Sequence, residues 1–222
     1  MGEEMIKAIL FDMDGTLLDS EIHYIEGTYI WMKRKGFKGD IQDLYCLVGK
    51  TMDETHLILA KLLNDKYTIE EIAKFNHDYF NYEKPLDFKK YIFDDVFASL
   101  KELKELGLKL AICSMSSLKD IDNFINSNNL VFDLVISGEN CKKQKPDPEI
   151  YLKALGKLNI TSDEAIVIED SFNGIKASKN ANIFTIARKD KRFNIPQEKA
   201  GADMFIDDLK DLSKYLKELN NE

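Results

Sequence analysis

Cysteine is scarce in this chain of 222 residues, and its pattern excludes two common kinds of site. Cys46, Cys113 and Cys141 form no C-x-x-C pair, and their number is odd. The sequence therefore favours neither a zinc site nor a disulfide framework. Because disulfides persist mainly in oxidising compartments, this usage suits a reducing one, and we expect a cytoplasmic protein.

Long hydrophobic runs are also missing. No stretch approaches the roughly 20 apolar residues that a membrane-spanning helix needs. Glu3 and Glu4 stand where a secretory signal would carry basic residues. We therefore expect no membrane partner.

Positive charge is in deficit. The chain has 31 lysines and arginines against 39 aspartates and glutamates, a formal net charge of −8. Nucleic-acid surfaces depend on basic patches, so we expect no nucleic-acid partner. With 44% hydrophobic and 32% charged residues the composition is that of a globular protein, and nothing in it demands more than a monomer.

What the chain does contain is a regular alternation of short apolar runs and helical patterns. Such alternation is typical of βαβ units, so we expect an α/β fold with a Rossmann-like parallel sheet. The strands are expected at 6–11, 108–113, 132–136, 165–169 and 183–187. The helices are expected at 94–106, 117–128, 147–157, 172–180 and 208–219.

The segment 19–85 interrupts this alternation. Its apolar residues recur mostly at helical spacing, which predicts a helical insert. We therefore expect a core domain made of 1–18 and 86–222 and a helical cap domain made of 19–85. A domain inserted at the carboxyl end of a strand is placed to act as a lid.

The first strand stops abruptly at two acids, Asp12 and Asp14, followed by Gly15. Ligands of parallel sheets bind at the carboxyl ends of strands, and two carboxylates this close repel each other unless a cation relieves them. The same residues would also fit an ordinary βα turn. An EF-hand loop fits poorly, because a third ligand before the glycine and a closing glutamate are missing and a strand precedes Asp12.

Other strand ends carry polar groups that suit the same site. Ser114 follows one strand, Glu169 ends another and Asp170 follows it, and Lys145 precedes a helix. Taken alone, Ser114 is more often a helix cap than a phosphate ligand, and a lone lysine such as Lys145 is by default a surface residue. Taken together, carboxylates from two strand ends form an oxygen cage that Mg²⁺ prefers, and the serine and lysine supply phosphate clamps.

These segments, in their order and spacing, resemble the four motifs of the haloacid dehalogenase-like superfamily. The likeness covers essentially the whole chain and is closest to the branch with a helical cap, which includes β-phosphoglucomutases and small-metabolite phosphatases. The matching segments are 12–16 (DMDGT), 19–21 (DSE), 49–51 (GKT), Ser114, 145–151 (KPDPEIY) and 168–175 (IEDSFNGI).

The resemblance implies a role for each acid. Asp12 would be the nucleophile that forms an aspartyl phosphate, and Asp14 the general acid and base. Mg²⁺ would be held by Asp12, the main-chain carbonyl of Asp14, and Asp170, with Glu169 a direct or water-mediated partner. Ser114 and Lys145 would bind the phosphoryl oxygens.

Two outcomes share this machinery, hydrolysis and phosphosugar transfer. The mutases carry a cap histidine twelve positions after the nucleophile, where this chain has Tyr24 and places His23 one residue early. Tyr24 and Lys50 are candidate cap contacts with substrate. We therefore favour a Mg²⁺-dependent phosphatase acting on a small phosphorylated metabolite, with a sugar phosphate as one candidate, over a β-phosphoglucomutase-type mutase. A non-catalytic regulatory or binding protein of this fold is the third alternative.

Overall fold

The computed structural model describes residues 6–193 and 197–219, so the expectation drawn from Glu3 and Glu4 lies outside the described residues. The chain divides into two compact units, one made of 1–19 and 88–222 and the other of 20–87. We call the first the core and the second the cap. Within the described residues, no helix has both the length and the apolar character needed to cross a membrane.

The core is built on a six-stranded sheet in the order β3-β2-β1-β4-β5-β6, with every neighbouring pair parallel. This confirms the predicted Rossmann-like α/β fold. The strands are β1 (Ala8–Phe11), β2 (Lys109–Ser114), β3 (Leu134–Ser137), β4 (Ala165–Glu169), β5 (Phe184–Arg188) and β6 (Met204–Ile206). The chain order reverses at β1, between β2 and β4, and this is where open parallel sheets bind their ligands.

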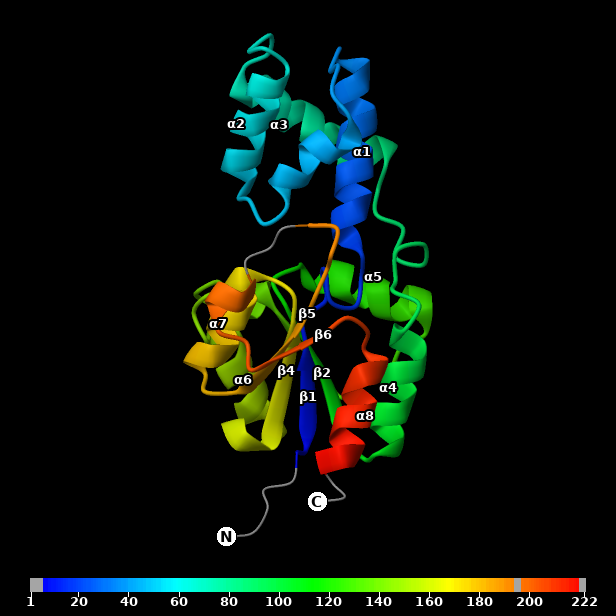
Figure 1. Ribbon diagram of the computed structural model, residues 1–222, viewed down its shortest axis with the longest axis vertical. Coiled ribbons are helices and arrows are strands. Elements are labelled where there is room, and N and C mark those ends of the chain that lie inside the picture. The colour runs from blue at the N-terminus through cyan, green and yellow to red at the C-terminus, as the bar shows by residue number, and fades with distance from the viewer. Residues whose placement is uncertain (1–5, 194–196, 220–222) are drawn as a thin grey trace. The chain divides into compact units, whose positions relative to one another are not determined.

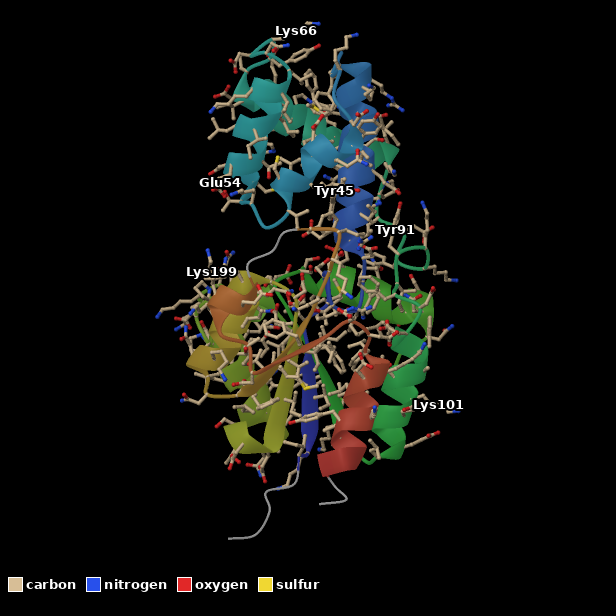
Figure 2. The ribbon with its side chains drawn as sticks, in the orientation of Figure 1. Tyr45, Glu54, Lys66, Tyr91, Lys101 and Lys199 are labelled. Atoms are coloured by element: carbon tan, nitrogen blue, oxygen red, sulfur yellow. The ribbon has the colours of Figure 1, made fainter. Side chains whose placement is uncertain are left out.

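Helices cover both faces of this sheet (Figure 1). One face carries α4 (Val96–Glu105), α5 (Leu118–Asn128) and α8 (Lys210–Leu219), and the other carries α6 (Glu149–Leu158) and α7 (Phe172–Asn180). All four residues of β1 are fully buried, which explains why the strand reads as a continuous apolar run. Lys101 of α4 projects away from the sheet into solvent (Figure 2).

The ends of the core elements follow local signals. The helix α4 ends at Gly107 with φ +80°, where the amides of Gly107 and Leu108 bond to the carbonyls of Lys104 and Leu103. This is a Schellman cap, in which a glycine in the left-handed conformation follows the last turn of the helix. Short 3₁₀ turns at Gly138–Asn140, Ser162–Glu164 and Gln197–Ala200 complete the core connections.

The strand β6 was not predicted from the sequence. It has three residues at the edge of the sheet, and Met204 and Phe205 are half-buried. An edge strand this short shows neither an alternating pattern nor a long apolar run, so periodicity does not reveal it.

The cap is entirely helical. It contains α1 (Ser20–Arg34), a 3₁₀ helix (Ile41–Leu47), α2 (Met52–Leu62), α3 (Ile69–Asp78) and a π-helix (Tyr79–Glu83). Thr51 and Thr68 begin α2 and α3 with capping boxes. Trp31, Leu59 and Ile72 anchor its own apolar core. Lys66 projects from the turn between α2 and α3 (Figure 2).

Candidate active site

The carboxyl ends of β1, β2 and β4 lie level with one another because the strands pair in parallel register. Phe11 of β1 pairs with Ile112 on one side and Ile168 on the other. Asp12, the next residue, therefore stands at the same level as Glu169. The sheet thus brings residues separated by more than 150 positions in the sequence to one edge.

Asp12 is a buried carboxyl, 7% exposed, that forms an ion pair with Lys145. The Nζ atom of Lys145 lies 2.5 Å from Oδ1 of Asp12. Burial raises the pKa of Asp12 to about 8; Lys145 opposes this rise, and the charges of Glu169 and Asp14 reinforce it. Asp12 therefore needs more positive charge than Lys145 supplies if it is to stay ionised at neutral pH.

Lys145 connects three strand ends through its ammonium group. Besides Asp12, it donates to Oε1 of Glu169 at 2.6 Å and to the carbonyl oxygen of Cys113 at 3.0 Å. Burial by itself would lower the pKa of Lys145, but the carboxylates of Asp12 and Glu169 outweigh it and raise that pKa well above its ordinary value. The lysine is a permanent cation inside the site.

Glu169 is fully buried, and protein donors surround its carboxylate. Oε2 accepts from the amides of Asp170 and Ser171 at 3.1 and 3.0 Å and from the hydroxyl of Ser171 at 3.0 Å. Oε1 accepts from Lys145 and from the hydroxyl of Tyr151 at 2.6 and 3.0 Å. A buried charge is stable only when it is bonded in this way.

Two glycines make room for the acids. A Cβ added to Gly174, in the first turn of α7, would lie 1.7 Å from Oε1 of Glu169. A Cβ on Gly15, whose φ is +76°, would lie 2.1 Å from Oδ2 of Asp170. Gly15 also adopts the left-handed conformation that glycine tolerates best. The backbone at both positions is shaped to the carboxylate beside it.

Asp170 is held from both sides of the site. The hydroxyl of Thr16 donates to its Oδ1 at 3.2 Å, and the buried amide of Gln197 donates to its carbonyl oxygen at 2.5 Å. Gln197 bonds at the same time to the carbonyl oxygen of Arg188 at the end of β5. Two separate segments therefore bond to Asp170 directly, and Gln197 links it to the end of β5.

Among the residues that the structure describes, Asp12, Glu169 and Asp170 form a group able to hold a metal ion, with one ligand oxygen from each all within 4.8 Å of one another. Opposite ligands of an octahedral Mg²⁺ lie about 4.2 Å apart, since each bond is about 2.1 Å long. The spacing and the all-oxygen donor set fit a divalent cation, and so does the cradle at Gly15, which a Cβ would fill.

Asp14 faces the serines that follow β2. The hydroxyl of Ser116 donates to its Oδ2 at 2.6 Å, and that of Ser114 approaches the same atom at 3.5 Å. Ser117 is the N-cap of α5, where its hydroxyl accepts from the amide of Asp120, whereas the hydroxyl of Ser116 turns toward Asp14.

The structure thus brings together the six site residues predicted in the core, namely Asp12, Asp14, Ser114, Lys145, Glu169 and Asp170. Sequence reasoning missed Ser116 and Tyr151. Ser116 lies two positions beyond Ser114 at a strand end. Tyr151 sits on the buried face of an amphipathic helix, where a hydroxyl needs a partner, and that was the available signal.

The two predicted substrate contacts, Tyr24 and Lys50, belong to the cap. Tyr24 is 45% exposed on α1, and its ring packs against His23 and Phe80. Lys50 is exposed in the loop just before Thr51. His23 is 1% exposed, and α1 is an uninterrupted α-helix around it. No bulge interrupts α1 at His23 or Tyr24.

Comparison with known proteins identifies similar chains along most of the sequence. Residues 9–188 match the family model described as haloacid dehalogenase-like hydrolase. A phosphorylated carbohydrates phosphatase from Thermotoga maritima is 32% identical over 183 residues, which cover 80% of this chain and 82% of that protein. A phosphoglycolate phosphatase from Aquifex aeolicus is 29% identical over 183 residues, covering 81% and 83%.

A solved structure is similar over almost the whole length. The β-phosphoglucomutase from Clostridium difficile has a TM-score of 0.68 and 25% identity, and the match covers 98% of each chain. The similar proteins therefore include both phosphatases and a phosphosugar mutase.

Proposed function

The chain belongs to the haloacid dehalogenase-like hydrolase family, and we propose that it hydrolyses a small phosphomonoester through an aspartyl phosphate formed on Asp12. A sugar phosphate is one candidate substrate, as the similarity to a phosphatase of phosphorylated carbohydrates suggests. The observation that carries the proposal is the meeting of Asp12, Lys145 and Asp170 at the carboxyl end of β1.

Asp12 is the proposed nucleophile because its Oδ1 pairs with the permanent cation Lys145 and its carboxylate is one of the three acids grouped at the site. One of its carboxylate oxygens attacks phosphorus in line as the bond from phosphorus to the leaving oxygen breaks. Lys145 and Ser114 bind the non-bridging oxygens, on which negative charge is spread in the transition state.

Asp14 is the proposed acid and base. It gives a proton to the leaving oxygen in the first half of the reaction and takes one from water in the second half. That water attacks phosphorus, so inorganic phosphate leaves and the Asp12 carboxylate is restored. The hydrogen bond from Ser116, at 2.6 Å, fixes the carboxyl of Asp14 for this task.

We assign a Mg²⁺ site to Asp12 and Asp170, with the main-chain carbonyl of Asp14 as a further ligand. Glu169 uses both of its oxygens for protein donors, which favours a water-mediated contact with the ion. When bound, the cation supplies positive charge that keeps Asp12 ionised and neutralises the phosphoryl oxygens.

Mutase activity is the second candidate, because a β-phosphoglucomutase is among the similar structures. The cap weighs against it. Tyr24 occupies the position of the mutase histidine, and His23 is 1% exposed on a regular helix. A mutase would convert β-glucose 1-phosphate to glucose 6-phosphate when supplied with catalytic glucose 1,6-bisphosphate. We expect release of free phosphate without isomerisation.

The proposal is tested with p-nitrophenyl phosphate and Mg²⁺. We expect turnover by the wild-type protein, background rates for Asp12→Asn, and rates within about twofold of wild type for Asp122→Asn, a matched change at an exposed position on α5. A wild-type rate at background, unchanged in Asp12→Asn, would overturn the proposal and favour a non-catalytic protein. A screen of phosphorylated metabolites then identifies the substrate.

A further inference from the structure

Tyr151 joins the apolar core to the acidic site. It is one of the largest fully buried side chains of the core, and its ring packs in the cluster between the sheet and the helices α6 and α7. Its hydroxyl donates to Oε1 of Glu169 at 3.0 Å. A buried tyrosine hydroxyl needs a partner, and here the partner is a charged carboxylate.

Lys145 shares that partner. Oε1 of Glu169 accepts from Nζ of Lys145 at 2.6 Å as well as from Tyr151. The same Nζ lies 5.1 Å from the centre of the Tyr151 ring, within the range of a cation–π contact. Tyr151 therefore touches Lys145 directly through its ring and indirectly through Glu169.

We propose that Tyr151 is a positioning residue of this site, whose hydroxyl competes with Lys145 for Glu169 and so leaves Lys145 able to bind a phosphoryl oxygen. The inference rests on the proposed function, because it takes Lys145 as a phosphate-binding residue. It adds a residue from the helix α6 to a site otherwise built from strand ends and the loops that follow them.

The competition between Tyr151 and Lys145 for Glu169 affects phosphate binding because Lys145 has few N–H donors. An ammonium group has three N–H donors, and those of Lys145 are engaged by Asp12, Glu169 and the carbonyl of Cys113. A phosphoryl oxygen must displace one of these acceptors. Glu169 holds the lysine less strongly when a second donor satisfies part of the same oxygen.

The hydroxyl of Tyr151 is a dependable donor. A phenol ordinarily has a pKa of about 10, so the hydroxyl of Tyr151 keeps its proton at neutral pH. A phenylalanine ring at this position would fill the same space and keep the cation–π contact. The Tyr151→Phe variant therefore isolates the hydroxyl.

The experiment measures phosphate and metal binding without turnover. Inorganic phosphate is titrated in excess Mg²⁺, and Mg²⁺ is titrated separately, with the rise in melting temperature as the readout. For Tyr151→Phe we expect the Kd for inorganic phosphate to rise about 5- to 20-fold, in line with the loss of a hydrogen bond to a charged group. The Kd for Mg²⁺ should stay within about twofold, because the bonds to Oε2 of Glu169 are intact.

The matched control is Tyr79→Phe, which removes a hydroxyl from a buried tyrosine of the cap, and it should leave both constants unchanged. A variant with 3-fluorotyrosine at position 151 keeps the O–H donor and should retain wild-type phosphate affinity. This variant is the test of the inference if Tyr151→Phe does not fold. Unchanged phosphate affinity in a folded Tyr151→Phe, or a weakened fluorotyrosine variant, overturns the inference.

This outcome is distinct from failure of the proposed function. If wild type and Asp12→Asn hydrolyse p-nitrophenyl phosphate equally, the proposed function fails. If they differ while Tyr151→Phe binds inorganic phosphate like the wild type, only the role of Tyr151 fails.

Discussion

The core and the cap present their polar residues in opposite ways. In the core, Asp12, Glu169 and Asp170 are at most 7% exposed, and other parts of the chain bond to each of them. In the cap, Tyr24 is 45% exposed and Lys50 lies in an exposed loop. The difference suggests that the core fixes the chemistry, which demands exact placement of charges, whereas the exposed cap side chains are free to vary with substrate.

The largest expected effects come from the two aspartates of the core. Asp12→Asn should reduce turnover to background and weaken Mg²⁺ binding. Asp14→Asn should reduce turnover by about 10²- to 10⁴-fold, the usual value of a general acid or base, while Mg²⁺ affinity stays near wild type. Steady-state kinetics and Mg²⁺ titration test both variants. Parallel loss of metal binding in Asp14→Asn would contradict the assignment of its metal contact to the main chain.

Alanine substitutions at two glycines test how closely the chain packs around the acidic site. Gly174→Ala places a Cβ 1.7 Å from Oε1 of Glu169, so we expect a loss of about 1–3 kcal/mol in the free energy of unfolding together with reduced kcat/KM. Gly156→Ala in α6 meets nothing within 4 Å and should stabilise the protein by about 0.5–1 kcal/mol. Denaturant unfolding measures both. Equal stability of the two variants would show that the acidic cluster is loosely packed.

The electrostatic strain of the core should appear in the metal-free protein. The pKa of Asp12 is raised from 3.8 to about 8 on folding, so the folded state holds a proton that the unfolded state releases. Its stabilising contribution is therefore complete below about pH 4 and is lost as the pH rises toward 8. Above neutral pH, metal-free Asp12→Asn should be more stable than wild type, by at least about 1 kcal/mol.

Melting temperatures measured from pH 5 to pH 9 in a chelator check this expectation. Mg²⁺ should raise the melting temperature of the wild type and reduce the advantage of the asparagine variant. If the melting temperature of the wild type increases with pH relative to that of Asp12→Asn, the claim that burial raises the pKa of Asp12 is contradicted.

The smallest effects are expected from the cap. Lys50→Ala and Tyr24→Phe should raise KM for the physiological substrate by about 3- to 10-fold, as the loss of one polar contact does. Both should leave kcat with p-nitrophenyl phosphate within about twofold of wild type. Kinetics with the two substrates separate these outcomes. Loss of kcat with both substrates would place chemistry in the cap and remove the contrast between the two units.

The sequence revealed most of the core because its signals are local. The strands β1 and β4 are buried runs that are almost wholly apolar, and the acids at their carboxyl ends, Asp12 just after β1 and Glu169 as the last residue of β4, mark the functional edge of the sheet. The bounds of β4 and α7 agree with the prediction, and most other element ends differ by one or two residues, since hydrogen bonding rather than hydropathy sets them. The edge strand β6 was not predicted because three residues, two of them half-buried, are too few to show a periodic pattern.

The site residues that the sequence did not reveal are those whose role depends on where the side chain points in the fold. Ser116 looks like a helix start in sequence, yet its hydroxyl reaches Asp14 because the chain turns between β2 and α5. Tyr151 looks like a core residue, and only the packing of α6 against the sheet shows that its hydroxyl meets Glu169. Neither contact follows from spacing along the chain.

The most direct test of the account is to trap the phosphorylated protein. Substrate is mixed with the wild type, the reaction is quenched in acid, and borohydride reduction converts an acyl phosphate on aspartate to homoserine, which peptide mass spectrometry locates. The account predicts homoserine at position 12 and an unmodified Asp14. Homoserine at position 14, or turnover with no modification of either residue, would contradict it.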